Sequence, residues 1–99
     1  MSKRETIEVE NVNVAGRVTN VNAKKYEAMR GVLLKVLPKD PPGLTQAEMG
    51  DAVLPHLPQD LWPKGKKSMW WVKTVQLDLE AKGLLVRSKE GRSTRWRRS

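Results

Sequence analysis

The stretch SMWWVKTVQLDLEAKG, residues 68–83, decides the fold, because it carries the start, the buried face and the end of one amphipathic helix. Ser68 is of a residue type that caps helices by accepting a hydrogen bond from a backbone amide of the first turn. Gly83 stands where helices commonly end in a left-handed residue. Apolar side chains recur between them at helical spacing and predict a buried face, at Val72, Val75 and Leu79.

The same helix carries a second stripe, at spacings of four and three residues, formed by Trp70, Thr74, Leu77 and Ala81. A helix that reads DNA presents polar and basic groups on its outward stripe. This stripe is largely apolar, Asp78 adds an acidic group, and only Lys73 suits DNA. We therefore expect Trp70, Thr74 and Leu77 to form an interface, covered either by the N-terminal segment or by a partner chain.

The chain before this helix predicts two further helices and an extended segment. Residues 7–21 have strand-like alternation interrupted by asparagines and Gly16, which predicts an extended arm attached through its valines. A first helix is expected over residues 23–37, capped by Asn22. A capping box at Thr45 opens a second helix, and Leu44 before it can make a one-residue strand contact.

Two irregular segments flank the third helix. Residues 55–67 form a long proline-rich loop ending in PKGKK, with Leu57, Leu61 and Trp62 as expected core contacts. After Gly83 we expect a strand over residues 84–86, ended by Arg87-Ser88. A hairpin loop over residues 89–92 and a return strand with an inward Trp96 complete the prediction.

The positive charge of the chain is confined to its last third. The 99 residues have a net charge of +8, and residues 64–99 alone hold eleven basic residues against three acidic ones, so residues 1–63 are neutral. Such asymmetry indicates a polyanionic partner, most often nucleic acid; a solvated basic tail is the alternative. The predicted nucleic-acid contacts are Lys64, Lys66, Lys67, Lys73, Arg87, Lys89, Arg92, Arg95, Arg97 and Arg98.

Composition argues against several other classes of protein. There are no cysteines and one histidine, His56, so neither a disulfide framework nor a metal site is expected. No paired acid and base, nucleophile or phosphate-binding glycine loop is evident, so we expect no enzyme activity and no cofactor. No apolar run is long enough for a membrane span and no signal peptide is visible, so a cytoplasmic protein is predicted.

Two stretches also resemble a known group of proteins. YEAMRGVLLKVLP (residues 26–38), LWPKGKKSMWWVKTVQLDLEAKGLL (residues 61–85) and the basic ending together resemble a small family of uncharacterised bacterial proteins. Those proteins are thought to adopt a winged-helix fold, and the resemblance covers roughly residues 20–98. It implies DNA binding, as in the wider winged helix-turn-helix superfamily, some of whose members instead mediate protein contacts.

Pattern and resemblance together predict an α+β, mostly helical, winged helix-turn-helix of three helices plus a C-terminal β-hairpin wing. Residues 1–21 are the expected N-terminal arm and residues 22–99 the winged-helix domain. The predicted function is nucleic-acid binding, to double-stranded DNA, through phosphate contacts. The alternative is a protein-interaction or homodimerisation module on the same scaffold, with no direct DNA reading.

Overall fold

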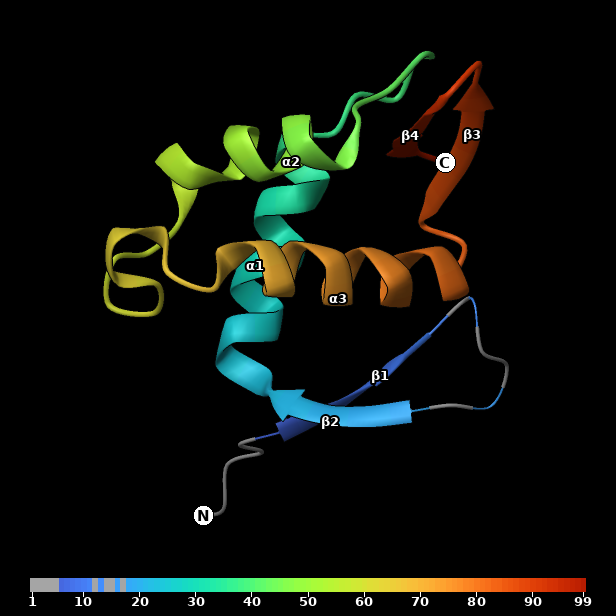
Figure 1. Cartoon of the computed structure of the whole chain (residues 1–99). Helices are drawn as coiled ribbons and strands as arrows, with labels where there is room; N and C mark the ends of the chain where they lie inside the picture. The colour runs from blue at the N-terminus through green and yellow to red at the C-terminus, as the bar shows by residue number, and fades with distance from the viewer. Residues whose placement is uncertain (1–5, 12, 14–15, 17) are drawn as a thin grey trace.

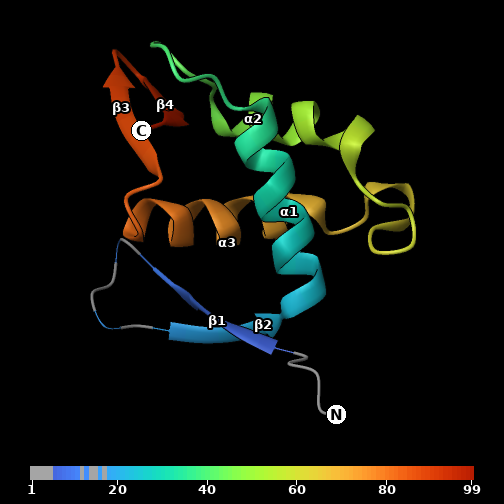
Figure 2. The ribbon, with the colours of Figure 1, turned by 180° about the vertical axis from the view of Figure 1, so that it is seen from behind.

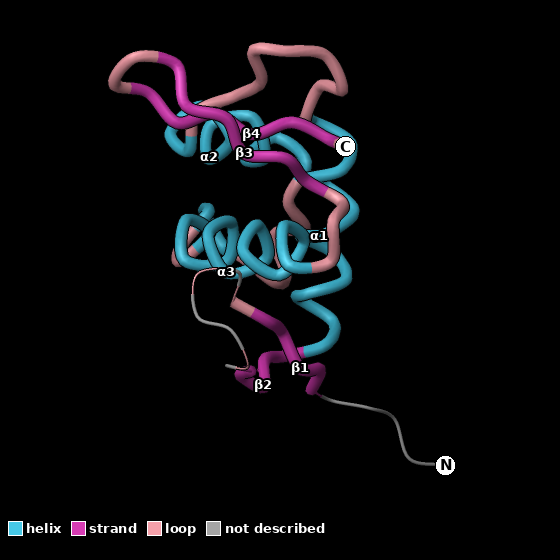
Figure 3. The backbone as a smooth tube through the Cα atoms, turned by 90° about the vertical axis from the view of Figure 1, so that its right-hand side faces the viewer, coloured by secondary structure: helices cyan, strands magenta, loops and turns pink. Residues whose placement is uncertain are grey.

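Helix α3 (Ser68–Ala81) lies at the centre of the molecule and contacts every other layer (Figure 1). The computed structural model describes residues 6–11, 13, 16 and 18–99. Helix α1 (Ala23–Val36) crosses α3 on one side and lies in front of α3 in the reverse view (Figure 2). An N-terminal hairpin lies on one flank of α3, and helix α2 (Gln46–Val53) with a C-terminal hairpin lies on the other (Figure 3). The fold is therefore α+β, with three helices and two small antiparallel hairpins.

The N-terminal segment forms a hairpin rather than the single extended arm expected from its sequence. Strand β1 (Thr6–Glu10) pairs antiparallel with β2 (Val18–Asn22). Asn11, Asn13 and Gly16 lie in the connection between the strands, where Asn11 accepts a hydrogen bond from the Asn13 amide at 2.9 Å, whereas Asn20 and Asn22 belong to β2. Expected contacts of Val12 and Val14 lie outside the described residues. Val9 and Val21, one on each strand, are buried in the core, so the hairpin docks locally.

The caps of the first two helices confirm the sequence predictions. The Asn22 side chain accepts a hydrogen bond from the Lys25 amide at 2.9 Å and begins α1. Thr45 and Glu48 form a reciprocal capping box that begins α2. Each side chain satisfies an amide that the first helical turn leaves without a partner.

The start of α3 corrects the predicted cap at Ser68. Helix α3 begins at Ser68 itself, and Lys67, with φ of +65°, occupies the N-cap position without a side-chain hydrogen bond to the helix. The Ser68 side chain is buried beside the preceding turn η2 (Pro63–Gly65), not aimed at the first-turn amides. The other end agrees with the prediction: Gly83 has φ of +78°, and the Leu84 amide closes the helix on the Leu79 carbonyl at 2.9 Å.

The C-terminal hairpin is longer than predicted, and its loop is shorter. Strands β3 (Leu85–Glu90) and β4 (Ser93–Arg98) pair in register Arg87↔Trp96. Because β3 continues through the residues expected in the loop, only Gly91 and Arg92 connect the strands. Gly91 has φ of +60°, the left-handed conformation that tight hairpin turns require at this position. Leu44 makes the predicted one-residue bridge, to Trp96.

One core unites these elements. It contains Tyr26, Met29, Leu33 and Leu37 from the first helical segment, Met49 and Val53 from α2, and Val72, Val75 and Leu79 from α3. The segment between α2 and α3, which includes η1 (Leu54–His56), adds Leu57 and Trp62, with Leu61 packed against them. Within the described part of the chain, no helix is both long and apolar enough to cross a bilayer.

Candidate nucleic-acid interface

The lysines before α3 are held by a loop with unusual backbone geometry. Trp62 is completely buried and fixes the loop to the core, while Lys64, Lys66 and Lys67 remain exposed around the first turn of α3. Lys64 and Lys67 both have left-handed backbones, with φ of +55° and +65°. Residues other than glycine adopt this conformation infrequently. The loop thus presents three ammonium groups at the helix end that carries partial positive charge.

Lys73 is exposed on the surface of α3. Ion pairs with N–O distances up to 4.0 Å join none of the described acidic side chains to Lys64, Lys66, Lys67 or Lys73. Their charge is therefore not neutralised by an ion pair to any described group.

The basic residues of the C-terminal hairpin divide into two groups. In the first group, three residues predicted to contact nucleic acid form hydrogen bonds with other groups of the protein. Arg87 binds both oxygens of Glu80 at 3.0 Å, Arg95 contacts Glu48 at 3.2 Å and the Gly43 carbonyl at 3.3 Å, and Arg98 donates to the Leu37 carbonyl at 2.9 Å. Lys89 and Arg92 are exposed at the hairpin tip, and Arg97 is half-buried.

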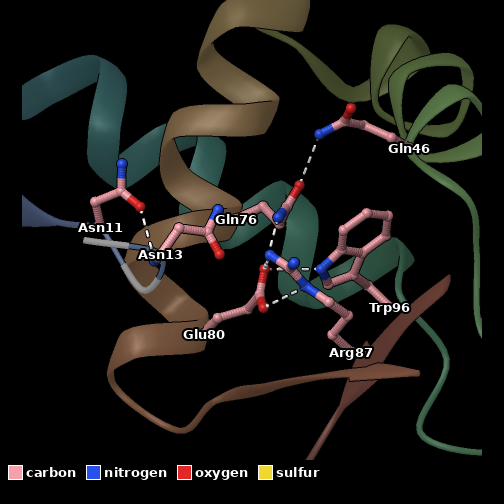
Figure 4. A network of polar contacts seen from close by, with 7 residues as sticks. All are labelled: Asn11, Asn13, Gln46, Gln76, Glu80, Arg87 and Trp96. Atoms are coloured by element: carbon pink, nitrogen blue, oxygen red, sulfur yellow. Dashed lines mark hydrogen bonds and ion pairs between the residues drawn. The ribbon is translucent and has the colours of Figure 1, made fainter. Parts of the chain in front are cut away.

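Glu80 organises the contact between α3 and the C-terminal hairpin (Figure 4). Its side chain is 7% exposed and accepts hydrogen bonds from Arg87, from the Trp96 indole at 2.8 Å and from the Gln76 amide at 2.6 Å. Gln76 in turn accepts from Gln46 of α2 at 2.9 Å. This chain of bonds fixes the hairpin and α2 against the same face of α3.

Asp78 is buried, which corrects its predicted outward position on α3. One carboxylate oxygen accepts from the Tyr26 hydroxyl at 2.5 Å, and the other accepts from the Glu10 amide at 2.9 Å. The Lys82 ammonium contacts both oxygens, at 2.7 and 2.8 Å. Asp78 therefore joins β1, α1 and α3, and it does not place an acidic group on the surface offered to a partner.

The charges around Asp78 shift the pKa values of its partners. Burial raises the pKa of the Tyr26 hydroxyl, and the hydrogen bond and negative charge of Asp78 raise it further. Burial alone lowers the pKa of Lys82, but its hydrogen bonds and attraction to Asp78 and Tyr26 outweigh burial, so the pKa is raised. Both groups are held in the protonated form.

The N-terminal hairpin covers only part of the second apolar stripe of α3. A shallow hollow between them is lined by β1, β2 and the three predicted interface residues, Trp70, Thr74 and Leu77. Thr74 and Leu77 are half-buried beneath the hairpin, whereas the Trp70 side chain stays 55% exposed. The three residues lie together, and only Trp70 remains broadly open to a partner.

The sequence reading missed the two acidic residues that organise the site. Asp78 and Glu80 lie only two positions apart, yet they bind opposite flanks of α3. For Asp78 the sequence does indicate a partner, because Lys82 follows it at the spacing of four residues that lets helix side chains form an ion pair. For Glu80, Gln76 lies at a spacing of four on the same helix, but Arg87 and Trp96 come from the C-terminal hairpin and no local spacing indicates them.

Among the described residues, no group of three or more histidine, cysteine, aspartate or glutamate side chains is arranged to hold a metal ion. The arrangement consists of exposed cations, one exposed indole and two structural carboxylates. Of these groups, ammonium groups attract anions, and an indole face stacks on flat aromatic rings.

These features define a small basic α+β domain whose exposed charge flanks its central helix. The chain belongs to the family of unknown function DUF6958, whose model matches residues 6–96. No curated protein and no solved structure matches the chain. The match agrees with the predicted resemblance to a family of uncharacterised function. The bacterial origin and the winged-helix fold that the resemblance implied stay predictions.

Proposed function

We propose that this protein is a winged-helix module that binds double-stranded DNA, mainly through phosphate contacts. The element order supports the assignment: three helices, a one-residue strand at Leu44 between the first two, and a β-hairpin after the third. In the winged helix-turn-helix arrangement the third helix approaches the major groove and the hairpin forms the wing. The corresponding elements here are α3 and β3–β4.

One observation carries the proposal: lysines that form no ion pair with any described acidic group surround the start and the exposed face of α3. Lys64, Lys66 and Lys67 surround its first turn, and Lys73 follows on its exposed face. Lys89 and Arg92 are at the tip of the C-terminal hairpin, which follows the other end of the helix and extends along the flank that carries α2 (Figure 1). A helix of 14 residues spans about 21 Å, so the lysines at its start and the hairpin after its end can contact separate phosphates.

The proposed contacts are fewer than the ten basic residues predicted from sequence. Arg87, Arg95 and Arg98 already donate to groups within the fold. The remaining contact set is Lys64, Lys66, Lys67, Lys73, Lys89, Arg92 and Arg97. Phosphate contacts give affinity without reading bases, so we expect weak sequence preference.

A salt titration tests this proposal. Each neutralised phosphate of B-DNA contributes about −0.9 to the slope of log affinity against log salt, so the full contact set gives a slope of about −6 if every member neutralises one phosphate. We expect the triple variant Lys64→Gln, Lys66→Gln, Lys67→Gln to reduce the magnitude of the slope by about 3. Fluorescence anisotropy with a labelled duplex measures both quantities.

The matched control removes the same charge elsewhere. Lys24, Lys35 and Lys39 are exposed and lie on or just after α1. Their triple replacement by glutamine lowers the net charge equally, and we expect the slope to stay unchanged. Equal effects of the two triple variants, or binding that does not respond to salt, would remove the proposal.

The alternative, a protein-interaction or homodimerisation module, has less support. That alternative was based on two predictions, that the second apolar stripe of α3 is uncovered and that Asp78 places an acidic group on its surface. Leu77 is half-buried under the N-terminal hairpin, and Asp78 is buried. Only the exposure of Trp70 continues to favour a partner, and the lysines beside it favour an anionic one.

A further inference from the structure

Trp70 is the one tryptophan of the four that is not buried. Trp62, Trp71 and Trp96 are 0%, 7% and 7% exposed, whereas Trp70 is 55% exposed. Burial of so large an apolar side chain is ordinarily favourable. An indole left half in water at the start of the central helix therefore points to a ligand.

The exposed indole is held by a row of aromatic rings that leads into the core. Trp62 packs edge to face with Trp71 at a centroid distance of 6.0 Å, and Trp71 packs in the same manner with Trp70 at 5.2 Å. Because Trp71 is fixed by the core, Trp70 has a firm support on one side. A supported ring loses less conformational entropy when a ligand stacks on it.

The surroundings of Trp70 are basic. A hollow beside it is lined by Lys25, Lys67, Trp70 and Trp71. The Lys25 ammonium lies 5.9 Å from the centre of the Trp71 ring, and Lys67 is the N-cap residue of α3. None of the described acidic side chains lines this hollow, whereas Glu10 lines the neighbouring hollow under the N-terminal hairpin.

We propose that this hollow binds an unpaired nucleobase, which stacks on Trp70 while its phosphates contact Lys25 and Lys67. A flat aromatic ring joined to an anion is the ligand that complements an exposed indole between two ammonium groups. A base inside a duplex cannot offer its face to a side chain, so the site requires a single-stranded segment. The inference rests on the proposed nucleic-acid binding, and it assigns a second contact, which shares Lys67 with the duplex contact set but adds Lys25 and the Trp70 indole.

The experiment compares two probes and two variants. The probes are a labelled thymidine oligonucleotide of about 12 nucleotides, within the usual range of single-strand site sizes, and a blunt duplex of the same length. Trp70→Ala should weaken binding of the single strand by about 5- to 150-fold, the equivalent of one stacked base. It should change duplex affinity by less than about 2-fold, because duplex binding uses the phosphate contacts.

Met69→Ala is the matched control. Met69 precedes Trp70, is 46% exposed and does not line the basic hollow. Its replacement should leave both affinities unchanged, and Trp70→Phe should keep most of the single-strand affinity because an aromatic face remains. Lys67→Gln should reduce the salt slope for the single strand by about 0.7, the value for one phosphate.

The outcomes separate this inference from the proposed function. Single-strand binding that depends on Trp70, without any duplex binding, keeps the nucleobase site and removes the duplex function. Duplex binding with single-strand affinity unaffected by Trp70→Ala does the reverse. Sedimentation of the protein alone as a dimer that Trp70→Ala dissociates would assign the hollow to a second copy and overturn the inference.

Discussion

At the scale of single residues, Asp78 is fully buried and accepts hydrogen bonds at both carboxylate oxygens. A fully buried carboxylate is costly unless hydrogen bonds and a counter-charge compensate for its lost hydration. Asp78 obtains both, from the Tyr26 hydroxyl, the Glu10 amide and the Lys82 ammonium. These contacts explain how an acidic residue is accommodated at the centre of the fold.

The environment of Tyr26 predicts alkaline sensitivity. Its folded pKa is raised above 10.0, so the stabilisation is complete below about pH 10 and is lost as pH rises through the folded value. The raised pKa of Lys82 acts in the same direction and range. The chain has a single tyrosine, so ultraviolet absorbance of the tyrosinate reports Tyr26 alone. We expect a midpoint above 10 in the folded protein that returns to about 10 in denaturant.

The control is Tyr26→Phe, which keeps the ring and removes the hydroxyl. We expect it to destabilise the protein by about 1.5–3 kcal/mol near neutral pH, the usual value for a hydrogen bond to a charged group. It should also remove the tyrosine share of the alkaline sensitivity. A folded midpoint at or below that of the denatured chain would contradict the burial of Tyr26 against Asp78.

Gly43 gives a second prediction at this scale. It has φ of +85°, and an added Cβ would lie 2.8 Å from the carbonyl carbon of Trp96 and closer still to its oxygen. We expect Gly43→Ala to cost about 2–4 kcal/mol, from backbone strain together with this overlap. Gly83→Ala is the control, since Gly83 has φ of +78° but open space around it. Its cost should be about 1 kcal/mol; equal costs in urea denaturation would argue against the close approach of Gly43 to Trp96.

At the scale of elements, the C-terminal hairpin depends on Glu80. Glu80→Ala should cost about 2–4 kcal/mol, because the Trp96 indole and the Gln76 amide lose their acceptor in a buried setting. Amide hydrogen exchange should accelerate in β3 and β4 more than in α1. Glu27→Ala, which removes an exposed carboxylate of α1, should change stability by less than about 0.5 kcal/mol. Uniform acceleration across all elements would contradict a local role for Glu80.

The helices could be predicted from sequence because their signals are local. Asn22, the Thr45–Glu48 capping box and Gly83 each act within a few residues of the helix end that they define. The strands were predicted less well. The pairing of β1 with β2 and the extension of β3 depend on partners across a turn, which alternation in one segment does not identify.

The candidate site shows the same division. Exposure of the lysines before α3 follows from their charge, and their clustering is visible in the sequence. Which arginines serve the fold could not be predicted, because Glu80, Glu48 and the Leu37 carbonyl come from distant positions. Nor could sequence distinguish Trp70 from the three buried tryptophans, since all four lie among apolar or basic neighbours.

At the scale of the whole molecule, the surface predicts a monomer. Among the residues that the structure describes, the exposed large apolar side chains are Val18, Leu54, Met69 and Trp70, drawn from three separate segments. A stable dimer buries about 1,200 Å² or more of total surface, well beyond these side chains. We expect sedimentation at 11.3 kDa in the absence of nucleic acid. A dimer under these conditions would revive the homodimerisation alternative.

Leu77→Asp tests whether the N-terminal hairpin covers the second apolar stripe of α3. Leu77 lines the hollow beneath β1 and β2, so a carboxylate there should loosen the hairpin and destabilise the monomer by about 1–3 kcal/mol. Lys73→Asp, on the exposed face of the same helix, should leave thermal stability nearly unchanged. Dissociation of a dimer by Leu77→Asp without loss of stability would show that a partner, not the hairpin, covers the stripe.

The bonds of Asp78 also set an order for folding during synthesis on the ribosome. The carboxylate holds the Glu10 amide, 68 positions earlier, and the Tyr26 hydroxyl, 52 positions earlier. The N-terminal hairpin therefore leaves the ribosome before α3 but cannot complete its docking until α3 has emerged. Contacts this distant in sequence carry a large loop-closure cost. The hairpin is consequently translated before the helix that holds it and reaches its native environment after that helix.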